Sequence, residues 1–162
     1  MSKYLERAEK LRAIVEPHYN CAQSVLMSFS PDFNLSDEAA YNLAVHFGAG
    51  MKSGNVCGAV TGALMALGLA GKSDEKLAHQ VLTKFKENHQ GCLNCVDLLR
   101  QNKESGDNKK AHCDACVYEC VKIVEELIQN CRMKNIEIIM VDSMEELGKM
   151  SNIETKAAAA AE

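Results

Sequence analysis

The chain has 162 residues and a mass of 17.7 kDa, which fits one ordinary domain. Apolar residues make up 47% of the sequence, so we exclude global disorder. The formal net charge is −4 and no run is rich in Lys or Arg, so the chain lacks the usual charge pattern of a nucleic-acid-binding protein.

The N-terminal part of the chain is predicted to form three helices. Residues 4–15 place apolar side chains on one side of a helix. Asn20 is the predicted N-cap of a second helix at residues 21–29. Two acidic residues after Ser36 predict the start of a third helix, which we expect to run to about residue 47.

A glycine-rich loop at residues 48–55 leads into an uncharged segment. The loop lacks both the GxxxxGK[ST] order and a preceding strand pattern, so it does not predict nucleotide binding. The uncharged segment, residues 53–71, is long enough to span a bilayer, but its glycines favour a buried central helix of a bundle. Small residues at every fourth position predict a smooth ridge that another helix can approach closely: Gly58, Gly62, Ala66 and Ala70.

The C-terminal part is predicted to contain further helices at residues 73–89, 92–101 and 111–130, with a polar loop at 102–110. A β-rich segment follows at residues 136–141, and a capping box at residue 143 predicts a last short helix. Residues 155–162 contain five consecutive alanines and resemble a tag.

The predicted fold class is therefore all-α. We expect a multi-helix bundle with a buried Gly/Ala-rich central helix and at most one short β-rich segment in the tail. The expected boundaries are a helical cysteine-rich domain at residues 1–131, an extension at 132–154 and a tag or disordered tail at 155–162.

Eight cysteines carry the main chemical signal. Their density is below that of a disulfide scaffold, and the charged N-terminus lacks the apolar region of a secretory signal. We therefore expect a cytoplasmic protein with reduced thiols, in which clustered cysteines indicate metal or redox chemistry. The cysteines are Cys21, Cys57, Cys92, Cys95, Cys113, Cys116, Cys120 and Cys131.

Two of these cysteines are predicted at the starts of helices. Cys21 follows Asn20, and Cys57 follows Asn55 by two residues. Unpaired backbone N–H groups at a helix start favour the thiolate and lower a cysteine pKa. This favours a functional role for Cys57 over simple packing, and Gly58 beside it leaves room for a bulky partner such as a cluster.

Four of the cysteines form two CxxC pairs. Cys92 pairs with Cys95 and Cys113 with Cys116, at a separation within the window of about 15–20 residues for a four-cysteine zinc site. Their helical context argues against a zinc ribbon. Because Cys113, Cys116 and Cys120 share one helical stripe with valines, one or two of them are expected to be core residues.

The histidines and carboxylates give weaker signals. His18 lies near Cys21 and His112 adjoins Cys113, but both are better explained as solvated or capping residues than as ligands. No Ser/His/Asp order and no pair of carboxylates predicts a hydrolase.

Several sequence blocks together resemble one family. They are Asn20-Cys21-Ala22-Gln23-Ser24-Val25, Phe47-Gly48-Ala49-Gly50, Cys57-Gly58-Ala59-Val60-Thr61-Gly62 and Cys95-Val96-Asp97-Leu98-Leu99, before a cysteine that opens the last long helix. In this order they resemble the C-GCAxxG-C-C family of redox-active proteins, over roughly residues 4–128. A similar segment precedes the haem domain of split-Soret cytochromes, where it is associated with an iron–sulfur centre.

The resemblance implies a small helical protein with four family cysteines. Three of them fall on Cys21, Cys57 and Cys95. The fourth is Cys113 or Cys116, and we prefer Cys113 because the family's following valine then matches Val117. The remaining cysteines, including Cys92, are extra to the pattern.

Three functional hypotheses follow. The first is an iron–sulfur protein that transfers electrons or senses redox state, with Cys21, Cys57, Cys95 and Cys113 as ligands and Cys116 and Cys92 as alternates. The second is a structural or interaction module stapled by zinc. The third is a metal-free thiol oxidoreductase that uses a CxxC pair. If the protein is an enzyme, we expect an oxidoreductase.

Expectations about partners are coarser. We expect a redox partner protein, no bound nucleic acid and no membrane span. The sequence is also compatible with a homodimer.

Overall fold

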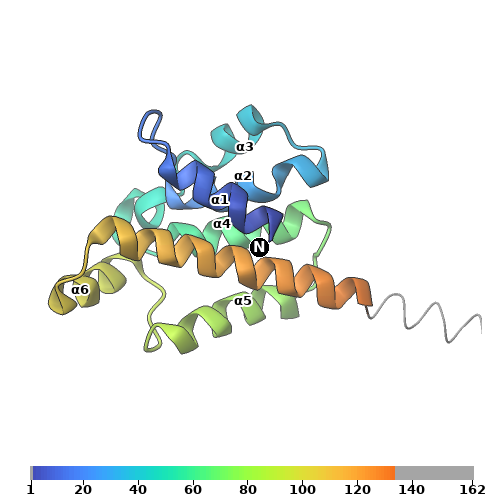
Figure 1. Ribbon diagram of the computed structural model, residues 1–162. Helices are drawn as coiled ribbons and strands as arrows, with labels where there is room; N and C mark the ends of the chain where they lie inside the picture. The colour runs from blue at the N-terminus through green and yellow to red at the C-terminus, as the bar shows by residue number, and fades with distance from the viewer. Residues whose placement is uncertain (1, 134–162) are drawn as a thin grey trace, which may run out of the picture. The chain divides into compact units, whose positions relative to one another are not determined.

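Helices make up the regular secondary structure of residues 2–133, the part of the chain that the computed structural model describes. This confirms the predicted all-α class. In chain order the elements are α1 (Lys3–Ala13), α2 (Cys21–Phe29), the 3₁₀ helix η1 (Ser30–Phe33), α3 (Asp37–Ala44), the turn η2 (Gly50–Gly54), α4 (Gly58–Leu69), α5 (Glu75–Asn88), α6 (Cys95–Ser105) and a last helix at residues 109–133 (Figure 1). The predicted β-rich segment, capping box and tag lie outside the described residues.

The predicted capping residues set the starts of two helices. Asn20 and Gln23 form a capping box, in which the Asn20 side chain accepts from the Gln23 amide at 3.0 Å and the Gln23 side chain accepts from the Asn20 amide at 2.9 Å. Ser36 caps α3 by accepting from the Ala39 amide at 3.1 Å. These bonds satisfy helix-start N–H groups that have no partner within the helix.

The central helix α4 is buried and packs extensively against α2. A Cβ atom added at Gly62 would lie 2.7 Å from the Ala22 carbonyl oxygen and 2.9 Å from the Val25 Cβ atom. The predicted smooth ridge is therefore confirmed at Gly62, because any residue with a Cβ atom would collide with the backbone of α2 at this position. Within residues 2–133, no helix is long and apolar enough to cross a membrane.

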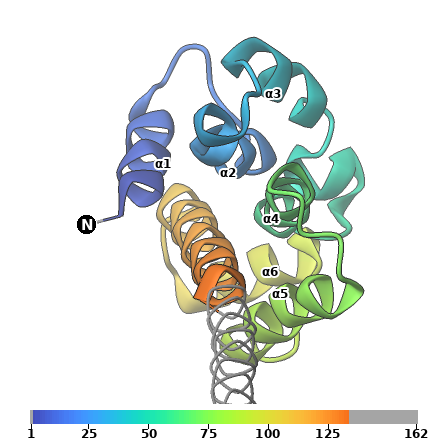
Figure 2. The ribbon, with the colours of Figure 1, turned by 90° about the vertical axis from the view of Figure 1, so that its right-hand side faces the viewer.

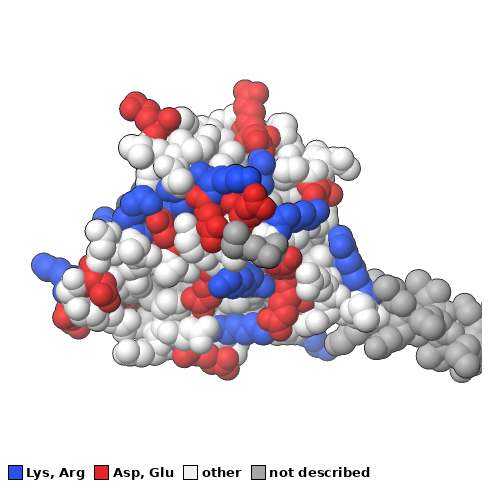
Figure 3. Space-filling view, viewed as in Figure 1, with Lys and Arg blue, Asp and Glu red and all other residues white. Residues whose placement is uncertain are grey.

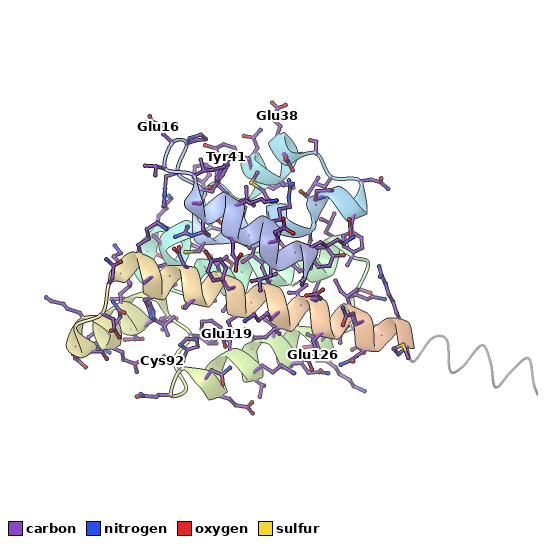
Figure 4. The ribbon with its side chains drawn as sticks, in the orientation of Figure 1. Glu16, Glu38, Tyr41, Cys92, Glu119 and Glu126 are labelled. Atoms are coloured by element: carbon purple, nitrogen blue, oxygen red, sulfur yellow. The ribbon has the colours of Figure 1, made fainter. Side chains whose placement is uncertain are left out.

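The last helix supplies much of the core. Figure 2 views it nearly end-on, with α1, α2, α4 and α5 arranged around it. Its buried valines pack in one cluster with Phe29 of α2 and Phe85 of α5. The last helix also directs Glu119 and Glu126 toward α5 (Figure 4), where Lys84 Nζ lies 2.8 Å from Glu126 Oε1.

Helix α6 differs from the prediction at both ends. It begins at Cys95 rather than Cys92, because the preceding residue Asn94 forms an isolated antiparallel β-bridge with Val56. It continues to Ser105 and ends at Gly106, which has a φ of 76°. The polar loop predicted at 102–110 is thereby reduced to residues 106–108.

Candidate cysteine site

Five of the eight cysteines line one cavity of about 520 Å³. Four separate stretches of the chain contribute them, and each contribution lies at or near the start of a helix. Cys21 is the first residue of α2, Cys57 is the N-cap of α4, Cys95 is the first residue of α6, and Cys113 and Cys116 lie near the start of the last helix. The fold thus gathers thiols from across the sequence at one place.

Backbone pairing fixes the starts of α4 and α6 side by side. The Cys57 amide donates to the Leu93 carbonyl at 2.8 Å, and the Cys95 amide donates to the Asn55 carbonyl at 2.7 Å. These bonds flank the β-bridge between Val56 and Asn94. The spacing between the Cys57 and Cys95 backbones is therefore set by main-chain geometry rather than by side-chain packing.

The start of α2 is held in place by Asn20 and Gly58. The Asn20 side chain donates to the carbonyls of Ala44 and Val45, at 3.2 and 3.1 Å. A Cβ atom added at Gly58 would lie 3.2 Å from the Cys21 Cβ atom. The glycine after Cys57 therefore lets Cys21 approach the start of α4, so Cys21 takes up part of the space that the sequence suggested for a bulky partner.

Two pairs of thiols interact across helices. Interaction with the Cys116 thiol is the largest cause that lowers the pKa of Cys57, and the same interaction raises the pKa of Cys116. The backbone N–H groups of Ala59 and Val60 lower the pKa of Cys57 further, while burial opposes them. This is the effect that we predicted for a thiol at a helix start.

Cys21 and Cys113 form the second pair. Interaction with the Cys21 thiol, together with the positive charges of Arg12 and Lys109, lowers the pKa of Cys113 to about 7 against the opposing effect of burial. The same interaction and burial raise the pKa of Cys21, so the lowered pKa predicted for Cys21 from its position at a helix start is wrong. Burial also raises the pKa of Cys95. Each pair thus combines a thiol that ionises readily with one that holds its proton.

Arg12 is a site residue that the sequence did not reveal. Its side chain is only 3% exposed, donates from Nε to Asp114 Oδ1 at 2.6 Å and from Nη1 to the Tyr19 carbonyl at 2.8 Å, and lines the cavity. Lys110 binds the other Asp114 oxygen at 2.7 Å. An arginine on an amphipathic helix looks solvent-exposed in a sequence, so no pattern could have identified its role.

His112 also lies at the cavity, in contrast to the solvated or capping role expected from the sequence. Its Nε2 atom is 3.8 Å from Cys116 Sγ. Burial lowers the pKa of His112. The four-residue spacing from His112 to Cys116 on one helix was the signal available for this contact.

The turn before α4 closes another side of the cavity. Four consecutive residues, Ala49 to Lys52, have positive φ angles between 53° and 61°. Ala49 and Lys52 line the cavity. Three of the four are not glycine, and such left-handed residues cost about 1–3 kcal/mol each, so this turn is held in a strained conformation beside the thiols.

The remaining cysteines lie outside the lining of this cavity. Cys92 precedes α6 and accepts a hydrogen bond from Gln101 Nε2 at 3.3 Å (Figure 4). Cys120 is fully buried in the core, as expected for part of the cysteine–valine stripe. Cys131 is half-buried. The CxxC partners are thus separated, since Cys95 reaches the cavity and Cys92 does not.

The thiols surround a space instead of meeting at a point. Among the described residues, no three Cys, His, Asp or Glu side chains converge closely enough to hold one metal ion. A single zinc ion would require ligand sulfurs about 2.3 Å from a common centre. The arrangement is that of a helical bundle with a thiol-lined cavity.

Comparison with known proteins agrees with this description. A family model described as "Putative redox-active protein (C_GCAxxG_C_C)" matches residues 19–127. The chain belongs to this family, and the predicted resemblance is confirmed. No curated protein and no solved structure matches the chain significantly. The match includes all five cavity cysteines but begins after Arg12.

Proposed function

We propose that the chain is a redox protein that holds an iron–sulfur cluster in the cysteine cavity and serves in electron transfer or redox sensing. The observation that carries this proposal is the convergence of five thiols, from four separate stretches of chain, on one cavity. Iron–sulfur clusters are held by cysteine thiolates, usually four. We assign Cys21, Cys57, Cys95 and Cys113 as ligands, with Cys116 as the alternative to Cys113.

The surroundings of the thiols support this assignment. A cluster is larger than a single ion, so its ligands encircle a volume, as the five cysteines do here. When bound, the cluster would supply one-electron chemistry. The N–H groups of Ala59 and Val60 near Cys57, and the positive charges of Arg12 and Lys109 near Cys113, would stabilise negative charge on the sulfurs.

The decisive experiment is purification of the full chain without oxygen, followed by a visible spectrum and by assays for iron, sulfide and zinc. We expect broad absorbance near roughly 400 nm, with iron and acid-labile sulfide in similar amounts. A colourless protein with stoichiometric zinc would overturn the cluster and establish the zinc-stapled alternative. A colourless protein without metal would reject both metal-binding hypotheses and leave thiol–disulfide exchange as the function to test.

Single variants would then assign the ligands. Cys21→Ala, Cys57→Ala and Cys95→Ala should each lose most of the iron and sulfide, and comparison of Cys113→Ala with Cys116→Ala should identify the fourth ligand. Cys92→Ala is the matched control, because Cys92 lies outside the cavity lining. Loss of iron from Cys92→Ala equal to that from Cys57→Ala would contradict the assignment.

Thiol–disulfide exchange is the second candidate, and the interaction of Cys21 with Cys113 and of Cys57 with Cys116 favours it. In the metal-free protein, a small disulfide such as oxidised glutathione would accept two electrons from each pair, giving one protein disulfide and two molecules of reduced glutathione. Peptide mapping should then find Cys21 linked to Cys113 and Cys57 to Cys116. Links within the CxxC pairs would contradict this version.

A further inference from the structure

The lining of the cysteine cavity is strongly biased toward positive charge. Its lining contains four Lys or Arg residues and two histidines, and no Asp or Glu among the described residues. The four cations are Arg12, Lys52, Lys109 and Lys110, and the histidines are His18 and His112. The whole chain has the opposite bias, with 18 Lys and Arg against 22 Asp and Glu. Figure 3 shows positive and negative side chains interspersed on the face that carries α1 and the last helix.

Part of this positive charge is balanced within the protein. Arg12 and Lys110 share the carboxylate of Asp114, which lies behind the lining. Lys52 and Lys109 are exposed and form no ion pair with any carboxylate in the described part of the chain. Lys109 lies close enough to Cys113 to help lower the pKa of that thiol, and its charge also acts on Cys95, where burial is the larger effect and raises the pKa. The cavity lining therefore includes two exposed lysines, Lys52 and Lys109, whose charges are not paired with a carboxylate in the described part of the chain.

We propose that the cavity selects negatively charged redox reactants, which Lys52 and Lys109 attract to the thiols. This inference rests on the proposed function only in taking the cysteine cavity as the redox centre, whether it works through a cluster or through the thiols. A cleft lined by one sign of charge concentrates reactants of the opposite sign and raises their association rates by about 10–1000-fold. The expected reactant class is a small molecule that carries carboxylates or other anionic groups.

Three disulfides with different terminal charges provide the test, and each rate is divided by the rate of the same disulfide with a small free thiol, because their leaving thiols differ in pKa. The disulfides are 3,3′-dithiodipropionate, which is anionic, bis(2-hydroxyethyl) disulfide, which is neutral, and cystamine, which is cationic. With the reduced, metal-free full chain, a cysteine thiolate attacks the disulfide, forms a mixed disulfide and releases one small thiol. Mass spectrometry measures the rate constant at each cysteine.

After this normalisation, we expect the anionic disulfide to react with the cavity thiols about tenfold faster than cystamine at low ionic strength, with the neutral compound between them. About 0.5 M salt should largely remove this order because it screens the charges. The double variant K52E/K109E should equalise or invert the order. The variant K72E/K76E is the matched control, since it changes the net charge equally in the segment that leads from the other end of α4 into α5, outside the cavity lining, and should keep the wild-type order.

Two results would overturn the inference. One is that the three disulfides have equal normalised rate constants at the cavity thiols of the wild-type protein. The other is an equal response of K52E/K109E and K72E/K76E, which would show that net charge rather than the cavity decides. Circular dichroism checks that both variants are folded.

A cluster-bearing preparation allows the same comparison with ferricyanide and hexaamminecobalt(III) as oxidants. Because the two oxidants also differ in driving force and in self-exchange rate, the measured quantity is the effect of the variant: K52E/K109E should slow oxidation by ferricyanide and speed oxidation by hexaamminecobalt(III). The disulfide series needs no cluster, so absence of iron would reject the proposed cluster without affecting this test of charge selection.

Discussion

Cys113 is the thiol with the clearest expected reactivity. Its pKa of about 7 lies below the value of about 8.5 for an ordinary cysteine. In the reduced, metal-free protein, alkylation of Cys113 by iodoacetamide should therefore reach half its maximal rate near pH 7. Because the interaction with the Cys21 thiol is the largest cause, Cys21→Ala should move this midpoint to higher pH. Peptide mass spectrometry after timed labelling measures the rate.

Cys95 provides the internal control for this measurement. Burial raises its pKa, so its labelling should rise only at higher pH than that of Cys113. Equal labelling of the two cysteines at pH 7 would contradict the assigned environments.

Removal of one partner of the Arg12–Asp114 ion pair should strongly destabilise the protein, because the other charge would be left buried and uncompensated. Asp114→Asn removes the charge that faces an arginine only 3% exposed, and breaking a buried pair from one side costs about 3–5 kcal/mol. Asp97→Asn is the control, because Asp97 pairs with an Arg100 side chain that is 66% exposed, where such pairs contribute at most about 1 kcal/mol. Urea unfolding measures both. Similar losses in the two variants would show that Arg12 does not depend on Asp114.

At the scale of elements, the contact between α2 and α4 depends on Gly62. Gly62→Ala would force a Cβ atom to within 3 Å of the α2 backbone, and we expect a loss of about 1–3 kcal/mol in the free energy of unfolding. Gly68→Ala in the same helix meets nothing within 4 Å and should be neutral or stabilising by up to about 1 kcal/mol. Thermal unfolding of the two variants provides the comparison. A stable Gly62→Ala protein would mean that α2 can shift away.

Elements with local signals could be predicted from the sequence. Caps such as Asn20 and Ser36 act within one turn, so the starts of α2 and α3 were correctly predicted. The start of α6 was missed because it depends on a bridge to Val56, far away in the sequence. The sequence predicted only a loop at residues 49–52 and not its four left-handed residues, because residue types such as Met51 and Lys52 do not indicate a positive φ.

The site shows the same division between local and long-range information. The sequence singled out the cysteines that line the cavity, and the family resemblance grouped them. The pairing of Cys21 with Cys113 and of Cys57 with Cys116 depends on how helices distant in sequence pack, which no spacing encodes. The basic lining was missed for the same reason, because its residues come from several separate segments.

At the scale of the whole molecule, a bound cluster would link the starts of several helices. A group that binds only the folded state stabilises that state, so removal of the cluster by a chelator should lower the melting temperature. Hydrogen exchange should increase mainly around Cys57, Cys95 and Cys113, at the cavity. An unchanged melting temperature after complete loss of iron would contradict a cluster held by cysteines from several helices.

The wide spacing of the cavity cysteines also has a consequence for biosynthesis. A ribosome adds about 5–20 residues per second, so Cys21 emerges roughly 5–20 s before Cys116. During that interval the early thiols have no partners from the last helix and are open to attack by other thiol reagents in the cell. The site therefore cannot be completed before Cys116 has emerged: a protein that protects the early thiols would act on the growing chain, and one that delivers metal would act after the start of the last helix has emerged.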